Sequence, residues 1–284
     1  MIAQTGAHTA MEGQGNPART SAPGQPPTAR VDGPQLFARY AYPPNSLGYC
    51  GPADSGALLE YGAAGVTDAG LVDLARGFAG AWPYLELIAR ATGIRDPLDR
   101  RVVEAYWVGT PLLDTISATD IGNSMEDRFR ARTGHQFSHL AQGVVAGGVP
   151  HHSFHVFEIY PWVGLLRDDR KSTSALSVLD RCRIRWGTVV STSGDEAVVR
   201  SRPLEWDGMA LRLGEPRLET ARCSTGGTGF VSALLPGEVV SLHWDWVCDR
   251  LTGSQLQQLR RFTHRHLTIA NVGVEHRGAA LAIG

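Results

Sequence analysis

The sequence is poor in cysteine and has no long apolar run. Its 284 residues include only four cysteines (Cys50, Cys182, Cys223 and Cys248), and none of them forms a Cys-x-x-Cys pair. So few, widely spaced thiols argue against a disulfide framework and favour reduced cysteines in a cytoplasmic protein. No apolar stretch approaches the roughly 20 residues that a membrane-spanning helix needs. A basic segment followed by an apolar one is also missing near the N-terminus, so we expect no secretory signal.

An excess of charge of one sign is missing too. The chain has 27 Lys and Arg residues against 28 Asp and Glu residues, a formal net charge of -1, and Lys171 is its only lysine. We therefore expect no general attraction to nucleic acid or to an anionic membrane. The hydrophobic content of 43% is ordinary for a soluble globular protein.

The first part of the chain divides into a tail and a helical region. Residues 1–33 are rich in Gly, Pro, Ala, Thr and Gln, and bury too little apolar area to offset their ordering entropy, which predicts a disordered tail. Residues 34–170 predict a mainly helical domain with a late strand at Phe154–Tyr160, where aromatic and β-branched residues gather. Caps and helical spacing of apolar residues predict helices over Leu71–Phe78, after a cap at Thr67, and over Trp82–Ile88, Leu98–Tyr106 and Ser124–Arg132. The polar stretch 164–178 is predicted to be a connector.

Residues 180–270 predict a small OB-like β-barrel and a C-terminal helix, so the fold class is α+β. Turn signals separate short strands, which is typical of a small barrel or sandwich. The predicted strands are Arg183–Ser191, Ala197–Arg202, Met209–Leu213, Arg217–Cys223 and Val239–His243. The alternation of Trp244 and Trp246 predicts that both lie on one face of a strand, with His243 and Asp245 together on the other face. A closing helix is capped by Thr252 or Ser254 and lines one face with apolar residues.

The same region carries a family pattern. Cys182-Arg-Ile-Arg-Trp-Gly187 stands at the start of the first predicted strand. A hairpin turn follows at Ser193-Gly194, and Pro236-Gly237-Glu238-Val-Val-Ser-Leu-His243 leads through the late strand. In this order the features resemble the HypC/HupF hydrogenase-assembly chaperones over about a third of the chain. In that family the cysteine follows the initiator Met, whereas Cys182 is internal. The whole chain also resembles an uncharacterised actinobacterial family associated with hydrogenase genes.

The resemblance implies a non-enzymatic accessory protein, or chaperone, in NiFe hydrogenase maturation. It implies that Cys182 binds transient iron, as the iron–cyanide–carbonyl precursor, with His243 as its partner residue. The expected protein partners are the hydrogenase large subunit or other maturation proteins. A thiolate is a soft ligand suited to such iron, and a nearby imidazole can lower the pKa of the thiol. The alternative is that both residues are simply buried in the core.

A second candidate is a cysteine-dependent enzyme. Cys50 precedes a predicted helix over Ala53–Tyr61, whose dipole would favour a thiolate. The Cys-Gly-Pro string at Cys50 also occurs in some papain-fold enzymes, including bacteriocin-processing peptidases and phytochelatin synthases. A downstream histidine could then complete an acyl-transfer site, the candidates being His151, His152 and His155. The alternative is a rigid loop packed over an inert Cys50.

The histidines His151 and His155 are also weak candidates for metal ligands. In an extended segment they would share a face but lie roughly 13 Å apart at ~3.3 Å per residue, too far for one ion. Further ligands would have to come from Cys50, His135 or His139. A third possibility is a binding protein whose cysteines are inert.

Overall fold

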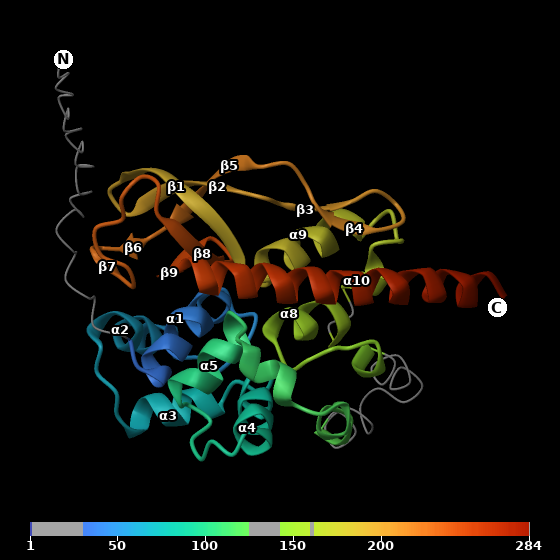
Figure 1. Cartoon of the computed structure of the whole chain (residues 1–284), viewed down its shortest axis with the longest axis horizontal. Helices are drawn as coiled ribbons and strands as arrows, with labels where there is room; N and C mark the ends of the chain where they lie inside the picture. Colours follow the sequence, from blue (N-terminus) through green and yellow to red (C-terminus); the bar gives the residue numbers. More distant parts are fainter. Residues whose placement is uncertain (2–30, 125–142, 160–161, 284) are drawn as a thin grey trace. The chain divides into compact units, whose positions relative to one another are not determined.

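The computed structural model describes Met1 and residues 31–124, 143–159 and 162–283, without the side chains of residues 274–283 (Figure 1). The chain divides into two compact units, Met1–Arg30 and Val31–Gly284, and the fold below is that of the second unit. Most of the predicted tail, the predicted helix Ser124–Arg132 beyond Ser124, and the candidate ligands His135 and His139 lie outside the described residues.

Helices build one layer of this unit. Aspartate side chains accept hydrogen bonds from backbone N–H groups at four helix starts, which are capped by Asp32, Asp54, Asp68 and Asp99. The helices are α1 (Gly33–Ser46), α2 (Ser55–Ala64), α3 (Ala69–Arg76), α4 (Trp82–Ala91), α5 (Arg100–Trp107), η1 (Pro111–Thr115), α8 (His152–Phe154), η3 (His155–Ile159), η4 (Val163–Leu165), α9 (Ser172–Cys182) and α10 (Gly253–Ile283). The predicted helices at α3, α4 and α5 are confirmed, although the cap of α3 is Asp68 and not Thr67.

The second layer is a sheet. Its order is β1-β2-β5-β9-β8, and β1 also pairs with β8, so the sheet closes on itself. β5 and β9 run parallel, whereas the other neighbours are antiparallel. The strands of this sheet are β1 (Arg185–Ser193), β2 (Glu196–Ser201), β5 (Arg217–Arg222), β8 (Val239–His243) and β9 (Trp246–Arg250). Two small hairpins are separate from it. One pairs β3 (Leu204–Trp206) and β4 (Leu211–Leu213), and the other pairs β6 (Ser224–Thr225) and β7 (Thr228–Gly229). Helices and strands together make the chain an α+β protein, as predicted.

The predicted strand at Phe154–Tyr160 is wrong. Residues 152–159 are helical, first in α8 and then in η3, a π-helix; Tyr160 lies outside the described residues. Every residue from His151 to Glu158 is buried. A segment buried on all sides shows no alternation of polar and apolar residues, and its aromatic content therefore does not distinguish a strand from a helix.

Two other local predictions are wrong. The predicted connector 164–178 contains most of α9, whose buried Ala175, Leu179 and Cys182 follow helical spacing. The strand ending at His243 does not continue to Trp246, because Trp244 and Asp245 form a tight turn between β8 and β9. His243 and Asp245 therefore do not share a strand face.

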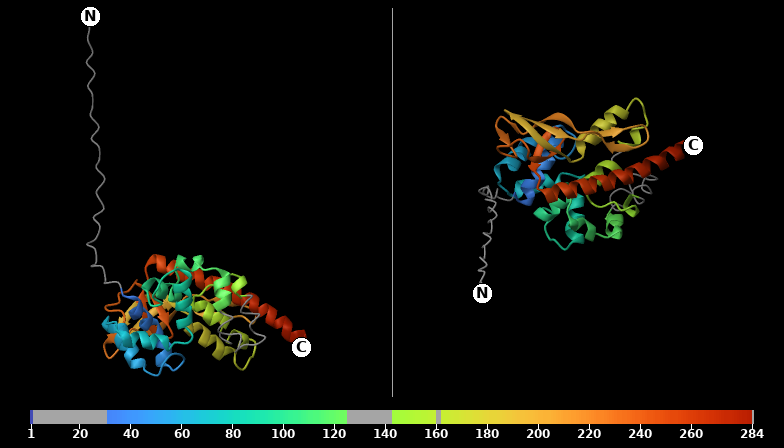
Figure 2. Two further views of the ribbon diagram at one scale, coloured as in Figure 1. Left: turned by 90° about the horizontal axis from the view of Figure 1, so that it is seen from below. Right: turned by 45° about the horizontal axis from the view of Figure 1, so that its top comes forward.

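The two layers share one core. Tyr40 of α1 stacks on Trp107 of α5 with ring centroids 5.6 Å apart, and its hydroxyl lies 2.8 Å from the Ser241 hydroxyl in β8. Helix α10 runs between the strands on one side and helices including α8 on the other (Figures 1 and 2). This packing brings α1, α5, α8, α9 and β8 together. No described helix is both long enough and apolar enough to cross a membrane.

Candidate metal centre

Three side chains from distant segments meet in the core. They are His152 at the start of α8, Cys182 at the end of α9 and His243 at the end of β8. One ring nitrogen of each histidine and the Cys182 Sγ all lie within 4.8 Å of one another. We call this the His-Cys-His cluster. Its members expose 5%, 8% and 0% of their surfaces, so bulk water does not surround them.

The tautomer of His243 is set by helix α1. Its Nδ1 lies 2.6 Å from the carbonyl oxygen of Tyr40, and because a carbonyl can only accept, Nδ1 carries the proton. Tyr40 has a carbonyl to offer because Pro44, four residues further along α1, has no N–H to donate to it. Nε2 of His243 then carries a lone pair, and it has no hydrogen-bond partner among the described residues. Burial lowers the pKa of His243 well below its usual 6.5, so the ring is neutral.

His152 is oriented by Cys182 itself. Its Nε2 donates to the Cys182 carbonyl over 2.8 Å, which leaves the lone pair on Nδ1, 3.3 Å from the Tyr106 hydroxyl. Burial lowers the pKa of His152 to about 4, so this ring is neutral as well. Cys182 thus contributes a thiol to the cluster and a carbonyl that holds one of its histidines.

The thiol of Cys182 is held in its protonated form. Burial, and to a lesser extent the neighbouring Cys50, raises the pKa of Cys182 above its ordinary value of 9.0. A metal ion would displace this proton, since the thiolate is the form that binds metal. With His243 Nε2 and a nitrogen of His152 released from its present hydrogen bond, two neutral imidazoles and one thiolate would form a donor set of the kind that binds transition metals such as zinc, copper and iron.

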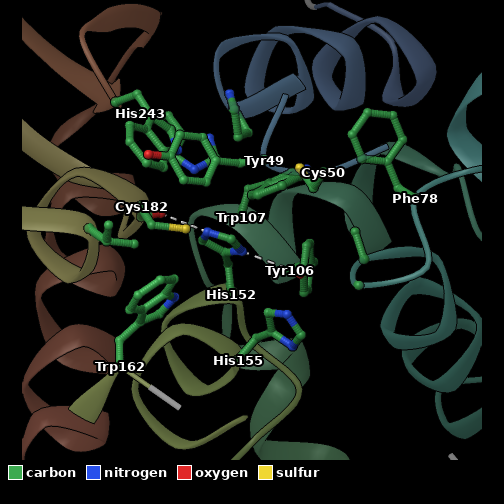
Figure 3. Close-up of a pocket in the computed structure, with 15 residues that line it drawn as sticks. Tyr49, Cys50, Phe78, Tyr106, Trp107, His152, His155, Trp162, Cys182 and His243 are labelled. Atoms are coloured by element: carbon green, nitrogen blue, oxygen red, sulfur yellow. Dashed lines mark hydrogen bonds between the residues drawn. The ribbon is translucent and has the colours of Figure 1, made fainter. Parts of the chain in front are cut away.

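The cluster lines a cavity of about 160 Å³ with aromatic walls (Figure 3). The aromatic residues around it are Tyr49, Phe78, Tyr106, Trp107, Trp162 and Trp244. Tyr49 is 54% exposed and stacks on Trp244, with ring centroids 4.1 Å apart. Trp244 has a positive φ of 54°, an uncommon backbone conformation for a bulky residue. This stack therefore covers the cavity between the loop before α2 and the β8–β9 turn.

Cys50 lines the same cavity but is not a member of the cluster. Burial raises the pKa of its thiol to about 12, which is the opposite of an activated nucleophile. Helix α2 starts only at Ser55, behind its cap Asp54, so Cys50 does not occupy the helix N-terminus. Asn45 donates hydrogen bonds of 2.7 Å and 2.6 Å to the carbonyls of Cys50 and Pro52 and so holds the loop.

The other two candidate histidines have separate surroundings. His155 lines the cavity one helical turn from His152, with ring centroids 6.5 Å apart, because the segment is helical and not extended. His151 points elsewhere: its Nδ1 lies 2.7 Å from the Ser153 hydroxyl, which lies 2.7 Å from Nδ1 of His266. This buried chain of hydrogen bonds ties α8 to α10. No local pattern in the sequence links His152 with Cys182 and His243, and none indicates a function for His266.

Residues 29–277 match the model of a family described as a family of unknown function, DUF6390. The chain belongs to this family. The DUF6390 match spans the helices, the sheet and all three members of the His-Cys-His cluster. Comparison with curated proteins gave no match, and comparison with solved structures gave none either.

Proposed function

We propose that this protein holds a transition-metal centre at the His-Cys-His cluster and acts as an accessory protein that carries it. The observation that carries the proposal is the convergence of His152, Cys182 and His243, with ligand atoms within 4.8 Å of one another. The orphaned Nε2 of His243 supports it, because a buried polar atom without a partner is costly unless a ligand satisfies it.

The cargo that fits best is iron bearing strong-field ligands. A thiolate suits low-spin iron with strong-field ligands such as cyanide and carbonyl, and the cavity leaves space for such ligands beside the cluster. The resemblance of Cys182–Leu259 to the HypC/HupF chaperones supports the iron–cyanide–carbonyl precursor as cargo, and the hydrogenase large subunit or a maturation protein as partner. In this proposal the chain passes its cargo on and catalyses no reaction.

The barrel belongs to the same proposal. We propose that the closed sheet is an OB-like barrel, made of β1, β2, β5, β8 and β9. Its first and fourth strands pair, and the parallel pair joins its third and fifth strands, as in an OB fold. In this arrangement α9 delivers Cys182 to the barrel from an internal position, which replaces the N-terminal cysteine of the family it resembles.

Cobalt(II) titration of the reduced full-length chain tests the metal site. Cobalt bound by a thiolate absorbs in the near ultraviolet, so binding at Cys182 has a direct spectroscopic signature. We expect this band in the wild type and in Cys223→Ala, whose half-buried thiol lies outside the cavity. Cys182→Ala should abolish the band and His243→Ala should weaken it. An unchanged band in folded Cys182→Ala would contradict the proposal.

The role in hydrogenase maturation is tested separately. Co-purification of the tagged chain with a hydrogenase large subunit or a maturation protein, lost in Cys182→Ala, is the expected result. Full hydrogenase activity in a strain that lacks the gene would exclude the maturation role while leaving the cobalt result intact.

A second candidate is a cysteine-dependent acyl transfer by Cys50. The observation that favours it is that Cys50, His152 and His155 line one cavity. Substrate binding would then have to lower the pKa of a thiol that burial holds at about 12. Iodoacetamide provides the test: if Cys50 reacts no faster than a free thiol near neutral pH, this candidate is rejected.

A further inference from the structure

A groove of about 690 Å³ lies on another part of the molecule, between the β1–β2 hairpin, β4 and α10. Among the described residues, none lines both this groove and the cavity of the His-Cys-His cluster. We call it the arginine groove. It provides a binding surface that the proposed metal site does not use.

The charge of the arginine groove has one sign. Of the residues that the structure describes, the charged ones lining it are Arg200, Arg202, Arg212 and Arg260, and none is an Asp or Glu. Arg212 pairs with Asp207, but the other three arginines form no ion pair with any described residue. All four are exposed. Since the net charge of the chain is -1, this gathering of cations is local and not a consequence of overall composition.

Apolar residues line the same groove. Leu211 and Leu267 are 3% and 5% exposed, and Leu256 is half-buried. Trp186 lies beneath the guanidinium of Arg260, 5.7 Å from its ring centroid. A ligand in this groove therefore meets cations and apolar side chains together.

We propose that the arginine groove binds an extended acidic segment of a partner protein. Arg200 at the end of β2 and Arg202 lie two positions apart, which spaces them by ~6.6 Å along an extended chain. Carboxylates at every second position of an extended peptide have the same spacing. A guanidinium binds a carboxylate through two parallel hydrogen bonds, so this match provides specificity as well as attraction.

A peptide fits the groove better than a nucleic acid does. Proteins that bind single strands stack bases on exposed aromatic rings. Among the described residues that line the arginine groove, the rings are those of Trp186, of which only 8% is exposed, and of His264, which is exposed. The groove therefore offers several cations but only one exposed ring, whereas a single strand stacks its successive bases on several rings.

Fluorescence anisotropy with a labelled peptide of alternating Glu and Ala tests the proposal on the full-length chain. We expect saturable binding that weakens as salt increases. The triple variant Arg200→Gln, Arg202→Gln, Arg260→Gln should lose affinity by about tenfold or more, about 1.4 kcal/mol. The matched variant Arg95→Gln, Arg167→Gln, Arg170→Gln removes three exposed arginines outside the groove and should bind like the wild type.

Two further peptides complete the experiment, and the melting temperature of each variant checks that it is folded. A peptide of alternating Lys and Ala should not bind, and one with all its glutamates in a single block should bind more weakly than the alternating peptide. No binding of the alternating peptide, or equal losses in the two folded triple variants, would overturn the proposal. Tighter binding of oligothymidylate through the same arginines would also overturn it, in favour of a nucleic acid. None of these outcomes depends on metal binding.

Discussion

His243 and Tyr40 are joined by a 2.6 Å hydrogen bond from an imidazole nitrogen to a main-chain carbonyl that Pro44 leaves free within its own helix. The bond fixes which nitrogen of His243 faces the His-Cys-His cluster. Residues that orient a metal ligand in this way typically change metal affinity by about 10-fold to 100-fold when they are altered. Pro44 is therefore part of the candidate site, although it is not a ligand.

The first prediction concerns this proline. Pro44→Ala restores an N–H that competes with His243 for the Tyr40 carbonyl, so we expect cobalt affinity to fall by roughly tenfold. Pro43→Ala is the matched control, because the N–H of an alanine at position 43 faces the Arg39 carbonyl and not that of Tyr40. Equal cobalt affinities in the two variants would show that the bond to Tyr40 does not position His243.

The second prediction concerns the cover of the cavity. Tyr49→Ala removes the ring that stacks on Trp244, and should speed alkylation of Cys50 and Cys182 by roughly tenfold, about 1.4 kcal/mol in opening free energy. The free energy of global unfolding should change by no more than about 0.5 kcal/mol, because Tyr49 is 54% exposed. Peptide mapping by mass spectrometry measures both rates. Leu47→Ala, on the same loop but outside the cavity, should leave them unchanged, and similar rates in both variants would disprove the role of the stack.

The third prediction concerns pH. Burial lowers the pKa of His151 to about 3 and that of His152 to about 4, from 6.5. Below pH 6.5 the unfolded chain takes up protons that the folded chain does not, so the free energy of unfolding falls on acidification. The loss should reach about 1.4 kcal/mol per pH unit for each histidine until the folded pKa is reached.

Urea denaturation at pH 7 and pH 5 measures this loss across the range in which the histidines of the unfolded chain titrate. Identical urea midpoints at the two pH values would mean that the buried histidines do not stay neutral in the folded state.

The fourth prediction concerns the contact between α5 and α10. Gly109 has a φ of 92°, and a Cβ there would lie 2.3 Å from Cδ2 of Phe262. Gly93 also has a positive φ, 70°, but has open space around it. Gly93→Ala should cost about 1–2 kcal/mol for its backbone alone, and Gly109→Ala about 1–3 kcal/mol more for the clash. Thermal unfolding of the two variants measures the difference, and equal losses would show that Phe262 moves aside freely.

Features with a local signal could be predicted from the sequence. The helical spacing of apolar residues placed α3, α4 and α5, and a Pro-Gly turn placed β8 at its observed bounds. Segments without such a signal could not. His152 to Ile159 is buried almost throughout and shows no period, and the turn at Trp244 has a bulky residue where a glycine or asparagine would normally mark positive φ.

The candidate site shows the same limit. Cys182 and His243 were singled out from the order of features around the sheet, and the structure places them together. The position of His152 beside them depends on how α8 packs against α5 and α9, and no spacing in the sequence encodes that. The proton position on His243 depends on a carbonyl of α1 some 200 residues earlier.

The wide separation of the three cluster residues along the chain has a mechanical consequence. A metal bound to His152, Cys182 and His243 would cross-link α8, α9 and β8 and close two long loops, which restricts the unfolded chain more than the folded one. Loaded and empty molecules would then differ in their resistance to heat and to proteases. The fold itself would report whether the protein carries its cargo.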